Sequence, residues 1–214
     1  MDATFEYSHR RFVPYFVIAL GILVFVVVAV GIAQPLKGPR NVALRAAALH
    51  DEKLIIDAVK AYQKTYGKLP VDPDASGVLV FSRDNNVLLD VLRNRTGQNY
   101  GNALNPRNFD ILQVPPSENQ KNPRGGLQIS TGVWYDPWGT PYHIAINIGH
   151  AAPITAKDIP NFYSDAGPLK DEVIVWSYGE NGKLGGGAAT NVGFSDEPGA
   201  PAKLFGSGDV VSWK

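Results

Sequence analysis

A run of 22 residues without a charge, from Phe12 to Ala33, constrains this chain more than any other feature of its sequence. A helix of about 20 apolar residues spans the hydrocarbon layer of a bilayer. Any other structure of a single segment in lipid leaves backbone polar groups unpaired. The run therefore predicts a transmembrane helix over residues 12–33.

A cleavable signal peptide is the alternative for the same run. Gly31, Ile32 and Ala33 precede Gln34 and offer the small residues of a cleavage site after Ala33. The apolar region of a signal peptide usually covers only about 7–15 residues, so the length favours an uncleaved anchor. Under both interpretations the rest of the chain works outside the cytoplasm.

Positive charges flank the segment on both sides and do not orient it by themselves. Arg10 and Arg11 precede it, whereas Lys37, Arg40 and Arg45 follow it. The short tail 1–11 favours a cytoplasmic amino terminus. We therefore expect a single-pass protein with its soluble domain on the far side of the membrane.

The charge and cysteine content exclude several classes of function. The chain has 20 Lys and Arg against 20 Asp and Glu, so it lacks the basic surplus of a protein that binds nucleic acid. It has no cysteine, which excludes disulfides, thiol catalysis, cysteine-type zinc sites and iron–sulfur clusters. We expect no nucleic-acid partner.

A linker and a long amphipathic helix are predicted after the apolar segment. Pro35 and Pro39 disfavour helix and indicate a linker over 34–40, followed by a domain over 41–214. Over 41–66 the apolar residues recur with a helical period, with Asn41 as cap and Gly67 as end. The charged residues expected largely outside the buried stripe are Glu52, Lys53, Lys60 and Lys64. The stripe itself comprises Leu44, Ala48, Ile55, Ala58 or Val59, Tyr62 and Tyr66.

The rest of the domain is predicted to add one short helix and a small sheet. Residues 86–95 carry an apolar face after a cap at Asp84 or Asn85. Apolar runs at 127–129, 142–148 and 172–176 suit strands separated by long loops rich in Gly, Pro and Asn. These elements predict an α+β fold in which the long helix covers one face of an antiparallel meander.

Three segments of the chain carry motifs that occur together in one protein family. Residues 57–70 end in YGKLP, similar to the family's helix end YGxYP. Residues 135–142 read YDPWGTPY, similar to its DPWGNPY turn. Residues 175–183 and 208–213 read VWSYGENGK and GDVVSW, similar to its carboxyl-terminal ending. The segments follow the family's order and are spread over residues 57–213. Together they resemble the major pseudopilin of bacterial type II secretion, within the type IV pilin-like superfamily.

The resemblance implies a structural subunit that acts by assembly rather than catalysis, in the bacterial inner membrane with its domain facing the periplasm or cell exterior. Its expected partners are the membrane, other pseudopilins or secretion-system subunits, and further copies of itself. The chain departs from the family at its amino end. Around Arg10 and Arg11 it has neither the glycine nor the following glutamate of the prepilin peptidase motif. An uncleaved anchor fits this departure.

The resemblance also implies a calcium ion in the carboxyl-terminal loop. By position, Asp209 keeps a carboxylate of the family's site, and Asn181 stands where the family has an aspartate. Both offer the oxygen ligands that calcium prefers. The alternative is a metal-free loop, and we expect no other cofactor.

No catalytic motif is present in the sequence, which contains neither HExxH nor GxSxG, nor a phosphate-binding loop. We expect no enzyme activity. A binding module of a different class remains as the alternative function. In that interpretation Trp134, Trp138 and Tyr142 form an aromatic platform for a glycan or peptide, whereas in the structural interpretation the same rings belong to the core.

Overall fold

The computed structural model describes residues 37–95, 101–149, 152–159, 162–185, 204 and 207–213. The chain divides into two compact units, Met1–Arg40 and Asn41–Lys214. The predicted tail over 1–11 and transmembrane helix over 12–33 lie outside the described residues. Within the described ranges, no helix is long and apolar enough to cross a membrane.

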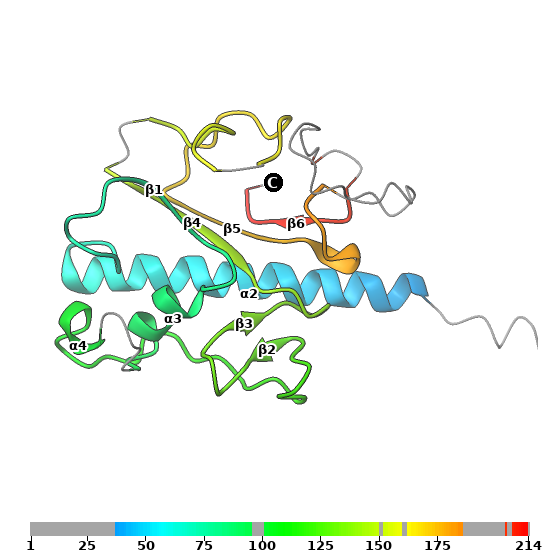
Figure 1. The fold of residues 1–214 in the computed structure, drawn as a ribbon, viewed down its shortest axis with the longest axis horizontal. Coiled ribbons are helices and arrows are strands. Elements are labelled where there is room, and N and C mark those ends of the chain that lie inside the picture. The colour runs from blue at the N-terminus through cyan, green and yellow to red at the C-terminus, as the bar shows by residue number, and fades with distance from the viewer. Residues whose placement is uncertain are drawn as a thin grey trace, which may run out of the picture. The chain divides into compact units, whose positions relative to one another are not determined.

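The described fold is α+β, with one long helix against a small antiparallel sheet (Figure 1). This confirms the predicted fold class at that level. The helices are α2 (Lys37–Tyr66), α3 (Asn86–Leu92), α4 (Gly101–Leu104) and the 3-10 turn η1 (Gly179–Asn181). The strands are β1 (Gly77–Phe81), β2 (Gly126–Leu127), β3 (Trp134–Tyr135), β4 (His143–Ile148), β5 (Val173–Ser177) and β6 (Val210–Val211).

Helix α2 begins at Lys37, four residues before the predicted start, so part of the predicted linker is helical. Pro39 fits there because a residue in the first turn has no intrahelical partner for its missing N–H. Asn41 is consequently not the cap, and its side-chain amide instead donates to Glu180 at 2.7 Å. The end is as predicted, since Gly67 takes a φ of +70° and its N–H donates to the Gln63 carbonyl.

The main sheet has the strand order β1-β4-β5-β6, and every neighbouring pair is antiparallel. Strands β2 and β3 form a separate two-stranded sheet. The predicted strands over 142–148 and 172–176 correspond to β4 and β5, which are antiparallel neighbours as expected. The predicted strand over 127–129 belongs instead to the separate sheet, so the predicted meander is only partly present. The prediction also missed β1, whose sequence GVLVF has no polar alternation.

Both faces of the main sheet are covered, one by α2 and α3 and the other by carboxyl-terminal segments. The predicted alternation in β4 is present, with Ile144 and Ile146 in the first core and Ala145 in the second. The first core also contains the predicted residues Ile55, Val59 and Tyr62 of α2, with Tyr66 partly buried beside them. The second core contains mainly aromatic and aliphatic residues that follow β4 in the chain, including Ile154, Phe162, Tyr163, Trp176 and Leu184.

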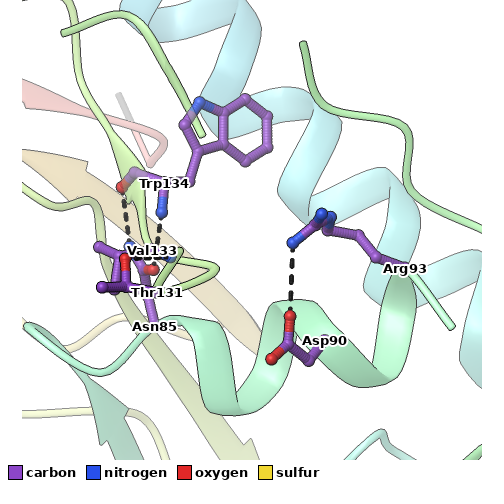
Figure 2. Close-up of polar contacts among 6 residues, drawn as sticks. All are labelled: Asn85, Asp90, Arg93, Thr131, Val133 and Trp134. Atoms are coloured by element: carbon purple, nitrogen blue, oxygen red, sulfur yellow. Dashed lines mark hydrogen bonds and ion pairs between the residues drawn. The ribbon is translucent and has the colours of Figure 1, made fainter. Parts of the chain in front are cut away.

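Asn85 connects the start of α3 to the small sheet rather than capping its own helix. Its amide nitrogen donates to the Trp134 carbonyl at 2.9 Å, and its oxygen accepts the Trp134 N–H at 3.0 Å (Figure 2). The same nitrogen also donates to the Tyr142 carbonyl at 3.0 Å. Asp90 and Arg93 of the same segment pair at 3.3 Å. The helix ends at Leu92 rather than Arg95, because Asn94 takes a φ of +52°.

Candidate functional site

Asp209, the first predicted calcium ligand, lies just before β6 and is buried. Its Oδ2 accepts a hydrogen bond from the Tyr163 hydroxyl at 2.5 Å and from the Gly185 N–H at 2.7 Å. Arg45 of α2 donates to its main-chain carbonyl at 3.2 Å. Asp209 therefore joins Gly185 and the Tyr163 side chain of the second core to the segment that leads into β6.

Asn181, the second predicted ligand, is exposed at the end of η1. Its side-chain oxygen accepts the Lys183 N–H at 2.8 Å, a contact within its own loop. Across the described part of the chain, no group of three or more His, Asp or Glu side chains is placed to hold a metal ion. Calcium binding through Asp209 and Asn181 stays a prediction, tested below.

The DPWGT turn between β3 and β4 is organised by the buried carboxylate of Asp136. Oδ1 accepts the N–H groups of Trp138, Gly139 and Thr140 at 2.9, 2.7 and 2.8 Å. Oδ2 accepts the Ser177 hydroxyl at 2.5 Å, which ties the turn to the end of β5. Burial raises the pKa of Asp136, although these hydrogen bonds oppose the shift. The carboxylate thus holds the turn together and joins it to β5.

Glu52 is the clearest error of the sequence analysis, because it was expected largely outside the buried stripe of α2 and is 0% exposed. The helical spacing of Glu52 indicates burial, because it lies four residues after Ala48 and three before Ile55, both of which are buried. No hydrogen bond of ordinary geometry reaches either carboxylate oxygen within the described residues. Burial, then the nearby charges of Asp51 and Asp136, raise the pKa of Glu52 from 4.5 to about 9, although the Ser177 main-chain N–H and the charge of Arg45 oppose the shift.

His143 is also buried, stacked against the rings of Trp176 and Tyr178 at centroid distances of 5.3 and 4.1 Å. Burial lowers its pKa from 6.5 to about 4, so the ring is neutral at neutral pH. This environment fits a core residue of the second sheet face rather than a metal ligand or a general base.

The aromatic platform of the alternative function does not form. Trp134 and Tyr142 are fully buried in the first core, where their rings meet edge to face at 5.6 Å. The Tyr142 hydroxyl donates to Asp51 of α2 at 2.9 Å. Trp138 is partly buried against the same core. These rings hold the small sheet to α2 instead of presenting a flat surface to a ligand.

The amino half of α2 carries an exposed apolar stripe that the sequence analysis did not single out. Val42 and Leu49 are 68% and 49% exposed, and Ala46 between them is also exposed. Their i, i+4, i+7 spacing places the three side chains on one side of the helix. We call these three residues the α2 stripe. Contiguous exposed apolar surface is typical of contact sites, and here Val42 and Leu49 supply the two large side chains.

A neighbouring side of the same helical segment is fixed to the domain. Arg45 donates to the Gly208 carbonyl at 2.6 Å, and Asn41 holds Glu180. The stripe is thus presented by a helix whose rotation about its own axis is set by contacts with the carboxyl-terminal segments.

No family model, curated protein or solved structure matches this chain.

Proposed function

We propose that this protein is a membrane-anchored, pseudopilin-like structural subunit of a type II secretion or type IV pilus-like apparatus, and that it acts by assembly rather than catalysis. The α2 stripe carries the proposal. It follows the uncharged segment 12–33 in the sequence, so an anchored chain presents Val42, Ala46 and Leu49 close to the membrane surface. Helices of neighbouring subunits can bury such a stripe against one another.

The positions of the family-like motifs in the fold support the same proposal. The YGKLP motif ends α2, and the DPWGT turn joins β5 through Asp136 and Ser177. The carboxyl-terminal motif supplies β6, which pairs with β5. Each motif thus contributes to the folding of one α+β domain, as expected of a subunit that acts through contacts at its surface. We place the anchor in the bacterial inner membrane and the domain in the periplasm or outside the cell.

Cysteine cross-linking tests this proposal directly, because the chain contains no cysteine of its own. Leu49→Cys in the full chain should give covalent dimers in native membranes with a short bismaleimide. Ala61→Cys is the matched control, since Ala61 is exposed on the same helix but lies about 120° around the axis from Leu49 at 100° per residue.

Adding Val42→Lys to the Leu49→Cys chain should remove the cross-link, because a lysine within a helix contact must be desolvated. Ser130→Cys, at an exposed loop position, reports the side of the membrane through an impermeant thiol reagent. Equal cross-linking of the Leu49→Cys and Ala61→Cys chains, or none in membranes where Ser130→Cys is labelled from the periplasm, would contradict assembly through the α2 stripe.

A further inference from the structure

Strand β1 lies at one edge of the main sheet and pairs only with β4 among the described strands. A strand paired on one side leaves the N–H and C=O groups of alternate residues directed away from the sheet. Its sequence from Gly77 to Phe81 contains no charge and no proline. Exposed edge strands usually carry charged residues or proline, which prevent pairing with a further strand. The edge is therefore chemically competent to accept another strand.

A pocket of about 320 Å³ adjoins this strand. Leu79 and Phe81 of β1 line it, together with Val87 and Leu88 of α3 and Leu104 of α4. Leu88 and Leu104 are buried, whereas the β1 side chains and Val87 are only partly covered. The volume lies at the lower end of the range for ligand pockets and suits one or two large apolar side chains.

The charged residues that line the pocket are both acidic. Asp72 and Asp74 belong to the turn before β1, and Asp72 Oδ1 accepts the Asp74 N–H at 2.9 Å. The Ala75 N–H also donates to the Asp72 carbonyl at 3.0 Å, so the turn is held in place by two hydrogen bonds. An occupant of the pocket therefore meets an apolar floor beside two carboxylates.

We propose that the β1 edge and this pocket bind an extended peptide segment of a partner protein, which pairs with β1 as an additional strand. One large apolar side chain of the peptide enters the pocket, and a neighbouring Lys or Arg lies beside Asp72 and Asp74. Main-chain hydrogen bonds supply affinity in this mode of recognition, and the side-chain pocket supplies specificity. The surface shares no residue with the α2 stripe, so the inference does not depend on the proposed function.

Charge complementarity favours a basic peptide over a second copy of this chain. Pairing of two β1 strands would bring one basic residue of each copy, Arg83, near the turn before the other strand. It would also bring the two aspartates of each copy's turn, Asp72 and Asp74, close to the pair, whereas the proposed peptide adds basic residues and no carboxylate. A partner segment with basic residues beside an apolar one matches both the carboxylates and the pocket.

Two capped, fluorescein-labelled peptides test the proposal by anisotropy, one with a Lys-Val-Phe-Val-Lys core and one with a Glu-Val-Phe-Val-Glu core. The full chain is used in nanodiscs of phosphatidylcholine, whose neutral surface attracts neither peptide, and empty nanodiscs give the background. We expect the lysine peptide to bind about tenfold more tightly, since two partly exposed charge pairs change sign between the peptides.

Asp74→Lys should reduce this preference to about threefold or less, because one of the two carboxylates is replaced by a positive charge. Asp74 is exposed, so the substitution leaves the core intact. Glu118→Lys, at an exposed position outside the pocket, is the matched control and should keep the preference. Hydrogen exchange in the same samples should slow at least tenfold at β1 with the lysine peptide and stay unchanged at β6, the opposite edge.

Three results would overturn the proposal. The first is equal binding of the two peptides, including no binding of either. The second is a preference for the lysine peptide that stays at about tenfold in the Asp74→Lys chain. The third is β1 amides that are already protected in a free chain that sediments as a dimer, which would assign the edge to a second copy.

Discussion

Replacing Glu52 by glutamine should stabilise the domain at neutral and alkaline pH. Glu52 is fully buried between α2 and the sheet, with no ordinary hydrogen bond to its oxygens from the described residues and with Asp51 and Asp136 nearby. Its charged form is therefore disfavoured in the folded state. Glutamine has nearly the same shape and carries no charge, so it keeps the packing and removes the cost of ionisation.

The expected size follows from the raised pKa. Below the ordinary pKa of 4.5, Glu52 is protonated in both the folded and the unfolded chain and has no pH-dependent effect. Between 4.5 and about 9 the folded chain holds a proton that the unfolded chain has lost, so the free energy of unfolding falls as the pH rises. At about 1.36 kcal/mol per pH unit the loss at pH 7 is of order 3 kcal/mol, and it levels off above the folded pKa.

Urea unfolding of the fragment 37–214, which contains every described helix and strand, measures this effect at pH 5, 7 and 9. The difference between Glu52→Gln and the parent should be small at pH 5 and grow with pH, reaching about 3 kcal/mol at pH 7. Glu118→Gln, an exposed control, should follow the parent at all three values. A Glu52→Gln fragment that keeps the parent's pH slope would refute a buried, protonated Glu52, and so would one that is less stable throughout.

Further substitutions probe the core at Tyr62 and the carboxyl-terminal loop at Asp209. Tyr62→Ala should cost about 3–5 kcal/mol in urea unfolding, because Tyr62 is fully buried, whereas Tyr62→Phe should cost about 1–2 kcal/mol by removing its hydrogen bond to the Leu104 carbonyl. A cost below about 0.5 kcal/mol for the alanine variant would contradict that packing. Calcium at a hundred times its dissociation constant should stabilise the domain by about 2.7 kcal/mol and raise the melting temperature by about 5–10 °C, an increase that chelator reverses. Asp209→Ala should abolish the increase, whereas Tyr163→Phe should keep it while lowering the starting temperature, since it removes only the hydrogen bond to Asp209. Equal melting of the parent with calcium and with chelator would leave the loop metal-free.

The sequence by itself determined the features that depend on residues close together in the chain. The helical period of α2 identified Ile55, Val59 and Tyr62 as buried, and Gly67 marked the end of the helix. The turn at Asp136 was predictable for the same reason, because its three N–H donors follow within four residues. Such patterns need no knowledge of the rest of the fold.

Only the tertiary structure decided the features that depend on segments distant in the chain. Glu52 is buried because the Asp136 turn and the end of β5 pack over α2. Its charged side chain led to the prediction that it lies outside the buried stripe. The Asp209 side chain accepts hydrogen bonds from Tyr163 and Gly185, which lie far from it in the sequence and belong to no motif around it. Strand β1 was missed because covering both sheet faces removes the polar alternation that identifies a strand. Burial is a property of the assembled layers, so a residue's own neighbours in sequence do not determine it.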